Sequence, residues 1–467
     1  MRNRFFYLSI TLVFVLFGSL IVQISMQNVK SVVKPYAEIP RGGDVAVIGG
    51  STAALITALV ASENGAQVHL FPQGQELGND TIYLMNEGLA TWGTPPQQAW
   101  VNAQEIEGLE YDEEETGGMN ITRESFQRML LARGEGMNDP LLLKRFLDKA
   151  PELHRWIQDF GIDFDDMPQP GYNPFWLQTS TPQAGFIFRE KLLEKLAQHS
   201  VFVQEETVKA IEMAENNGSV KALTLQNDEQ GETSLFYVQA VVLADGGYSS
   251  DLKSWYDYLP HHNIVNLRPG QTGRGIQMAA DLFADVVQSD FFNRRMVLSD
   301  AQAHQYQLLP RDPWEHAFLI NRSGQSLDLG LAKAGEAFSF IVNAPNKGIY
   351  VGVSEDEARV MPLFFTRFDQ WSQAIEAGWL DQAPALQAPP PYYLARVQAG
   401  VDYTLGGLSV TSEGEVRRRG MIINGLFAAG EIAGGLHGEA MAEGMPLSET
   451  LFLGRSAGEA AAAYARR

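Results

Sequence analysis

The pattern of apolar and polar positions predicts a strand–turn–helix–strand unit near residue 45. Residues 45–48 are all apolar, and Gly49 and Gly50 follow them at a turn. A mostly apolar stretch continues to Gly65, and residues 67–71 read as the next strand. A unit of this kind presents backbone N–H groups at the N-terminus of its helix, where a pyrophosphate can bind. The stretch is therefore a candidate dinucleotide site.

The glycine pattern of this turn departs from the usual form G-x-G-x-x-G. Gly49 fits the first glycine, Ser51 takes the place of the second and Ala54 that of the third. The acidic residue that usually closes the second strand and binds a ribose hydroxyl is replaced by Pro72. By itself, the turn fits a nucleotide site and an ordinary βα turn about equally well.

Helix and strand patterns continue through the middle of the chain. Asn138-Asp139-Pro140 is a good helix start, a cap followed by proline at the first helical position. We expect this helix to end near Lys149, and a second one to begin near Pro151. From residue 202, short alternating strands separated by turn residues predict an antiparallel β-meander. Its expected strands are 202–204, 208–213, 220–226 and 235–238.

Later segments return to strand–glycine–helix order. Residues 241–244 read as a fully buried strand, and residues 273–275 open another helix. Residues 425–429 form the last expected strand, and an alanine-rich helix follows from about Pro446 to Ala465. Residues 293–388 lose this rhythm, which indicates an inserted domain.

The fold class that follows is α/β, with a Rossmann-like domain, a β-meander, an inserted capping domain and an N-terminal transmembrane helix. The expected segments are 1–24 (signal anchor or transmembrane helix), 25–41 (linker), 42–292 (first part of the nucleotide-binding domain), 293–388 (capping or substrate domain) and 389–467 (second part of the nucleotide-binding domain).

The N-terminal stretch has the composition of a membrane anchor. Arg2 and Arg4 precede an apolar run from Phe5 to Ile24, the length of about 20 residues that spans a bilayer core. No A-x-A-like cleavage site follows, so an uncleaved anchor is favoured over a removed signal peptide. With the N-terminus in the cytoplasm by default, the remaining chain is expected outside it, in the periplasm.

Composition removes several classes of function. The net charge of −21 argues against binding of nucleic acid, which needs a basic face. The chain has no cysteine, which excludes disulfides, thiolate metal sites, iron–sulfur clusters, c-type haem and a cysteinyl link to flavin. No metal site is predicted. Electrons for any redox reaction would therefore need a separate donor or acceptor.

A set of motifs recurs in a fixed order over residues 42–467. The strongest is 425–431 (GLFAAGE) followed by 434–438 (GGLHG). The other motifs are 47–50, 78–79, 243–247, 272–275, 403–407 and 446–458. In this order they resemble the flavoprotein subunits of the fumarate reductase and succinate dehydrogenase family. That family also contains flavocytochrome fumarate reductases, urocanate reductases and 3-ketosteroid dehydrogenases.

The resemblance implies a non-covalently bound FAD. Residues 49–51 would face its pyrophosphate, Glu431 would accept hydrogen bonds from its ribitol chain, and the backbone at Leu447 and Ser448 would reach the isoalloxazine ring. The N-terminus of the last helix would point at the flavin and favour its reduced anionic form. The expected cofactor-binding residues are Gly49, Gly50, Ser51, Ala54, Asn79, Thr81, Gly246, Gly247, Gly430, Glu431, Leu447 and Ser448.

Departures from the family pattern concern the substrate and the adenosine side. Arginines that clamp a dicarboxylate are missing at Met441 and in residues 326–330, and Tyr403 replaces a histidine. The expected substrate is therefore a small molecule other than a dicarboxylate, of an enone or ketosteroid-like kind. Asp245, where the family usually has threonine, and Pro72 are expected to weaken dinucleotide binding.

Tyr403 and His437 are the candidate catalytic residues. A phenol can deliver or take a proton while hydride moves to or from flavin N5, although the ring of Tyr403 fits equally well as packing beside a glycine hairpin. His437 could bind substrate or brace its loop. The leading hypothesis is an oxidoreductase acting on CH–CH or C=C bonds. The alternatives are a non-catalytic descendant with weak or no FAD binding and, less well supported, an NAD-binding dehydrogenase.

Overall fold

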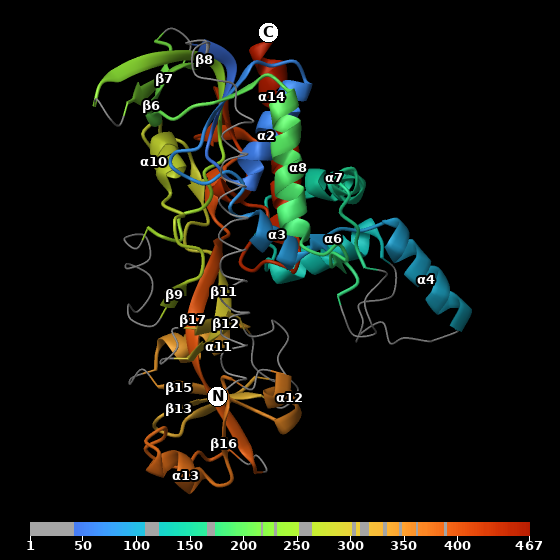
Figure 1. Cartoon of the computed structure of the whole chain (residues 1–467), viewed down its shortest axis with the longest axis vertical. Coiled ribbons are helices and arrows are strands. Elements are labelled where there is room, and N and C mark those ends of the chain that lie inside the picture. The colour runs from blue at the N-terminus through green and yellow to red at the C-terminus, as the bar shows by residue number, and fades with distance from the viewer. Residues whose placement is uncertain are drawn as a thin grey trace, which may run out of the picture. The chain divides into compact units, whose positions relative to one another are not determined.

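The chain forms two compact units, which are described separately. Unit 1 comprises Met1–Gly246, Arg274–Val287 and Gly407–Arg467, and unit 2 comprises Gly247–Gly273 and Gln288–Gly406. The computed structural model describes residues 42–107, 121–165, 173–215, 218–227, 231–251, 264–300, 305–308, 317–329, 334–344, 348–360, 363–386 and 390–467 (Figure 1). The predicted anchor, 1–24, and linker, 25–41, lie outside these residues. Within them, no helix has both the length and the apolar character needed to span a bilayer.

Unit 1 is built on a sheet whose central strands are parallel. The strand order is β19-β20-β8-β1-β2-β5, and β1 pairs in parallel with β8 on one side and with β2 on the other. These strands are β1 (Gly42–Ile48), β2 (Val68–Phe71), β5 (Val201–Val203), β8 (Thr233–Leu243), β19 (Glu415–Arg418) and β20 (Met421–Ala428). Residues 45–48 of β1 are wholly buried, as expected for a central parallel strand covered on both faces. The predicted α/β core is confirmed.

The β-meander is present but differs from the prediction at two strands. β6 (Thr207–Met213), β7 (Val220–Gln226) and the first half of β8 pair antiparallel. The separate strands expected at 235–238 and 241–244 are one strand, because nothing between them breaks the extended chain. The run expected at 202–204 is β5, which pairs in parallel with β2 instead of joining the meander.

Two helices pack closely against each other beside the sheet. α2 (Thr52–Glu63) and α14 (Met445–Ala465) lie side by side in Figure 1, next to α8 (Ala184–Gln198). A Cβ built at Gly454 would lie 3.0 Å from Cγ2 of Ile56, and one built at Gly458 would lie 2.8 Å from the carbonyl oxygen of Thr57. The two glycines of α14 therefore permit this close approach, and the predicted C-terminal helix is confirmed.

The two helices predicted between residues 140 and 160 are a single helix, α7 (Pro140–Gln158). The expected N-cap is present, since Asp139 Oδ1 accepts from the backbone N–H groups of Leu141 and Leu142 at 2.9 Å. Pro151 lies inside the helix. Proline removes one backbone hydrogen bond, but the buried apolar face continues from Leu142 to Ile157 and keeps the helix in place.

Short elements complete unit 1. They are α3 (Thr81–Glu87), α4 (Pro95–Glu107), α6 (Arg123–Arg133), α10 (Arg274–Ala280), the 3-10 turn η2 (Gly430–Ile432), the strand pair β3 (Leu89–Ala90) and β4 (Trp176–Leu177), and the small sheet of β10 (Val286–Val287), β18 (Gly407–Ser409) and β21 (Ala433–Gly434).

Unit 2 is a second sheet with helices, centred on the long strand β17 (Tyr392–Thr404). β17 pairs antiparallel with β15 along its first half and with β11 along its second half. The other elements are β9 (Ile264–Asn266), β11 (Phe292–Asp300), β12 (Gln305–Leu308), β13 (Phe318–Asn321), β14 (Ser326–Asp328), β15 (Ile349–Val353), β16 (Thr366–Phe368), α11 (Ala334–Val342), α12 (Glu355–Val360) and α13 (Trp371–Glu376). The unit is wider than the predicted insertion, 293–388, because β17 and the segment 247–273 belong to it.

Candidate active site

The turn between β1 and α2 meets a segment from the far end of the chain. Gly49 adopts φ +129°, which favours glycine, and its N–H donates to Phe71 O at 2.8 Å. A Cβ built at Gly430 would lie 2.6 Å from Cβ of Ala53, in the first turn of α2. The 430–431 motif and the Gly49 turn, expected to close around one cofactor, are therefore neighbours in unit 1.

The backbone N–H groups at the start of α2 are partly occupied by side chains. Gly50 N donates to Gln75 Oε1, and Thr52 N donates to Asp80 Oδ1, both at 2.7 Å. In the described part of the chain, the N–H groups of Ser51 and Ala53 have no acceptor. The predicted glycine turn is thus present, and two of the N–H groups at this helix start are without an acceptor in the described part of the chain.

Asp80 belongs to a buried network of hydroxyl groups. Its Oδ1 also accepts from Thr52 Oγ1 at 2.7 Å, and Thr52 Oγ1 lies 2.7 Å from Thr81 Oγ1, which donates to Gly78 O. Thr52 and Thr81 are both inaccessible to solvent. Of the two residues expected along the cofactor, Thr81 therefore lies at the turn, whereas the side chain of Asn79 is exposed.

Ser51 caps α2 in the ordinary way. Its Oγ accepts from the N–H of Ala54 at 3.2 Å and donates to Ala244 O at 2.6 Å. The serine that replaces the second glycine of the motif therefore ties the helix start to the end of β8. Ala54, at the third glycine position, is completely buried.

Asp245 follows β8 and is held by a backbone donor. Its Oδ2 accepts from the N–H of Gly275 at 2.8 Å, and Oδ1 has no hydrogen-bond partner among the described residues. Burial raises the pKa of this carboxyl from 3.8 to about 6, partly offset by the bond from Gly275. Gly246 ends this segment of unit 1, and Gly247 opens unit 2.

The predicted contacts at the start of α14 are buried. Leu447 and Ser448 have no exposed surface. Ser448 Oγ donates to Ala90 O at 2.7 Å and accepts from Ala90 N at 2.9 Å, so it joins α14 to β3. Glu431, in η2, is 5 % exposed.

His437 is paired with a carboxylate that the sequence did not single out. Its Nε2 lies 3.0 Å from Oε2 of Glu449 in α14, and both side chains are 1 % exposed. The loop before it is also held, since Asn138 Nδ2 donates to Leu436 O at 2.8 Å and Asp139 N donates to Gly435 O at 2.7 Å. Of the two roles considered for His437, bracing the loop has direct contacts in its favour.

Tyr403 lies in unit 2, inside a buried polar cluster on β17. Its side chain is 1 % exposed, and the guanidinium carbon of Arg268 lies 5.5 Å from its ring centre. The neighbouring Asp402 accepts from Asn293 Nδ2 at 2.6 Å and lies 3.5 Å from Arg295 Nε. Arg295 is 8 % exposed, because it pairs with this carboxylate.

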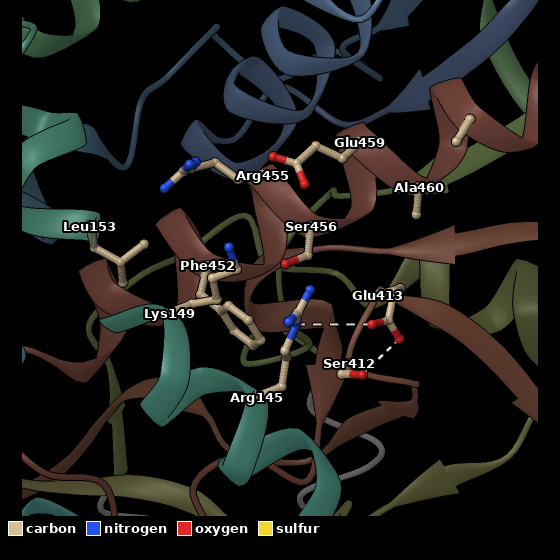
Figure 2. Close-up of a pocket in the computed structure, with 11 residues that line it drawn as sticks. Arg145, Lys149, Leu153, Ser412, Glu413, Phe452, Arg455, Ser456, Glu459 and Ala460 are labelled. Atoms are coloured by element: carbon tan, nitrogen blue, oxygen red, sulfur yellow. Dashed lines mark hydrogen bonds and ion pairs between the residues drawn. The ribbon is translucent and has the colours of Figure 1, made fainter. Parts of the chain in front are cut away.

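A separate hollow in unit 1 contains none of the predicted site residues. It has a volume of about 250 Å³ and lies between α7, α14 and the loop before β19. Figure 2 shows Arg145 and Ser412 both directed at Glu413, at 4.0 Å and 2.7 Å. Because none of the predicted site residues lines this hollow, the candidate site stays at the Gly49 turn.

The residues that sequence reasoning missed are Gln75, Asp80, Asp402 and Glu449. Two of them could have been found from the sequence, because Asp80 directly follows the 78–79 motif and Asp402 directly precedes Tyr403. The pairings of Gln75 and Glu449 are made by tertiary folding and leave no local pattern.

Together, the parallel sheet, the glycine turn and the returning 430–431 segment define an α/β protein of the dinucleotide-binding kind. The profile of the family described as "FAD binding domain" matches residues 44–447. The chain belongs to this family, and FAD is its cofactor. The open N–H groups of Ser51 and Ala53, beside Gly430, fit a pyrophosphate at that turn.

Proteins of similar sequence or fold include reductases and a dehydrogenase. The chain is 25 % identical over 470 residues to the NADH:fumarate oxidoreductase of Klebsiella pneumoniae, covering 91 % of this chain and 48 % of that protein. It therefore spans about half the length of that relative. The fold is similar to the open conformation of a flavocytochrome c3 fumarate reductase, with a TM-score of 0.71, 19 % identity and 95 % and 81 % of the two chains covered. It is also similar to the 3-ketosteroid-Δ4-(5α)-dehydrogenase of Rhodococcus jostii RHA1, with a TM-score of 0.67, 19 % identity and coverage of 91 % and 98 %.

Proposed function

We propose that this protein is an FAD-dependent oxidoreductase that transfers hydride between flavin N5 and a CH–CH or C=C bond of a small, non-dicarboxylate molecule of the enone type. The observation that carries the proposal is the approach of Gly430 to Ala53, which brings the 430–431 segment to the phosphate-binding turn. When bound, FAD supplies the hydride-transfer chemistry at its N5 atom.

The residues of unit 1 have positioning roles in this proposal. The N–H groups of Ser51 and Ala53 bind the pyrophosphate at the N-terminus of α2. Glu431 accepts hydrogen bonds from the ribitol hydroxyls, and the backbone at Leu447 and Ser448 lies at the isoalloxazine ring. His437, held by Glu449, keeps the 434–438 loop in a single conformation.

Tyr403 is the proposed proton donor or acceptor, because a phenol can exchange a proton with an enone while hydride moves.

A dicarboxylate substrate is disfavoured, because this chain has other residues at the positions where the family has clamping arginines. Met441 at one such position is buried and apolar, and it cannot form the bidentate bonds that a carboxylate requires. Among the similar proteins, this favours the ketosteroid-type substrate over fumarate.

The test is to purify the chain with added FAD, reduce the flavin anaerobically and follow its reoxidation by fumarate and by a 4-en-3-one steroid. The proposal expects reoxidation by the enone and little by fumarate, with a large loss of rate for Tyr403→Phe and unchanged FAD content. Rapid reoxidation by fumarate alone would contradict the proposed substrate class. An unchanged rate for Tyr403→Phe would remove the tyrosine from the chemistry.

A second candidate is a non-catalytic descendant that binds FAD weakly. It is favoured by one observation, the occupation of the Gly50 and Thr52 N–H groups by Gln75 and Asp80. Protein that stays colourless and takes up no added FAD would support this candidate. Yellow protein with a reducible flavin would exclude it.

For the whole protein we propose an uncleaved anchor at residues 1–24, an FAD-binding domain that corresponds to unit 1, a capping domain that corresponds to unit 2, and a periplasmic location. The anchor is suggested by the apolar run from Phe5 to Ile24. A separate electron donor or acceptor is required because the chain has no cysteine for iron–sulfur or c-type haem groups. Release of the full-length protein from washed membranes by alkaline carbonate would contradict the anchor.

A further inference from the structure

We propose that Asp80 is an internal competitor of the FAD pyrophosphate and sets the affinity of this protein for its cofactor. The inference rests on the proposed function, since it requires FAD at the β1–α2 turn. The Asp80 carboxylate already accepts hydrogen bonds at the N-terminus of α2, and a helix N-terminus of this kind binds phosphate.

The geometry places a negative charge on the first residue of α2. Asp80 Oδ1 accepts from both N and Oγ1 of Thr52, each at 2.7 Å. Distances this short are typical of hydrogen bonds to a charged acceptor. Thr52 itself is fully buried, so its N–H faces the carboxylate rather than water.

Asp80 makes these bonds instead of capping its own helix. It is the N-cap residue of α3, and aspartate is among the best residues at that position. Its side chain nevertheless makes no capping bond to α3. The start of α2, in contrast, already has a capping side chain in Ser51, which accepts from Ala54 N. The Asp80 carboxylate is therefore additional to the ordinary cap of α2.

Two anions compete for the same end of one helix. The open N–H groups of Ser51 and Ala53 flank that of Thr52, so a pyrophosphate bound to them comes close to the carboxylate. Like charges at this separation repel, and the bond between Thr52 and Asp80 has to break before Thr52 can donate to phosphate. FAD binding therefore works against a contact that stabilises the cofactor-free protein.

The test compares Asp80→Asn with the matched variant Asp139→Asn. Asparagine keeps an acceptor oxygen and removes only the charge. Asp139 also caps a helix N-terminus of unit 1, through Leu141 N and Leu142 N of α7, but it is not at the turn. We would titrate each apoprotein with FAD by flavin fluorescence, titrate it with ADP by calorimetry, and measure the Tm without ligand.

For Asp80→Asn we expect the Kd for FAD to fall by about ten-fold, the effect of about one charge-assisted hydrogen bond. ADP, which carries the diphosphate without the flavin, should gain a similar factor, while the apoprotein Tm falls. Asp139→Asn should lower the Tm and leave both Kd values unchanged. An Asp80→Asn variant that binds FAD and ADP as the wild type does, or more weakly, would overturn the inference while leaving the proposed function intact. Failure of all three proteins to bind FAD would instead overturn the proposed function and the inference with it.

Discussion

Gly430 lies so close to Ala53 that a Cβ added to it would be 2.6 Å from the Cβ of that alanine. One residue opens η2 near the C-terminus of the chain, and the other lies in the first turn of α2. Real Cβ atoms do not approach each other this closely, so only glycine fits at position 430. The contact fixes the 430–431 segment against the turn that we assign to the pyrophosphate.

Gly430→Ala should therefore weaken both folding and cofactor binding. The substitution adds the clash with Ala53 and places alanine at φ +75°. We expect a loss of about 2–4 kcal/mol in the free energy of unfolding and less bound FAD. Urea unfolding and the flavin content of the purified protein measure the two effects.

Gly420→Ala is the matched control for this prediction. Gly420 has φ +74°, and a Cβ built on it meets nothing within 4 Å. Gly420→Ala should therefore lower the free energy of unfolding by the backbone strain alone, about 1 kcal/mol. Equal losses for the two variants would mean that the contact with Ala53 has no energetic importance.

The unit around β1 and α2 could be predicted because its signals are local. A buried apolar strand, a glycine turn and a helix of small residues follow one another within residues 45–63, and all three are present. The C-terminal helix was predicted equally well, since its start at Met445 is one residue from the expected Pro446. Resemblance of motifs supplied the association of these two regions, which no local pattern contains.

Predictions failed where tertiary pairing overrides the local signal. Pro151 indicated a break between helices, but the buried face of α7 continues across it. Residues 202–204 alternate like a meander strand, but the edge of β2 pairs with them in parallel. In the same way, the side chains that occupy the start of α2 come from Gln75 and Asp80, and their direction could not be read from sequence.

The His437–Glu449 pair should stabilise the 434–438 loop. The paired atoms are 3.0 Å apart and both side chains are 1 % exposed, so removal of either partner takes a hydrogen bond away from a buried polar group. In a double-mutant cycle of His437→Ala and Glu449→Ala we expect a coupling of about 1–2 kcal/mol in the free energy of unfolding.

The half-buried pair Lys149–Glu152, also of unit 1, gives the reference for this cycle. Its coupling should be about 0.3 kcal/mol, as is usual for a helix surface pair. A coupling of that small size for His437 and Glu449, together with a raised KM for His437→Ala, would favour substrate binding over bracing.

Arg295 should be essential to unit 2 because it is the buried counter-ion of Asp402. Arg295→Met leaves that carboxylate with Asn293 but without its charge partner, and we expect a loss of about 3 kcal/mol in the free energy of unfolding. Arg322→Met removes the Arg322–Asp381 pair of the same unit, whose side chains are 39 % and 53 % exposed, and should cost under about 1 kcal/mol. Urea unfolding of the two variants decides between a structural ion pair and one without importance for stability.

Asp245 should make the protein less stable as the pH rises. Burial raises its pKa from 3.8 to about 6, so the native state holds the proton more tightly than the unfolded chain. The stabilisation is complete below pH 3.8 and is lost as the pH passes through 6. Asp245→Asn removes this dependence, because the amide oxygen can still accept from Gly275 N. At pH 7.5 the variant should be more stable than the wild type by about 3 kcal/mol, and at pH 4.5 by only about 1 kcal/mol.

The comparison with wild type at each pH isolates Asp245 from other titrating groups. Burial lowers the pKa of His69 to about 4, so this group makes the protein more stable as the pH rises. The effect is the same in the variant and in the wild type, and it cancels in the comparison. Asp285→Asn supplies a control of opposite sign. The N–H groups of Gly420 and Arg419 hold the pKa of Asp285 below 3.8, so its carboxylate adds stability at neutral pH and loses it on acidification. A stability difference between Asp245→Asn and wild type that stays constant from pH 4.5 to 7.5 would show that this carboxyl titrates alike in the folded and unfolded chains.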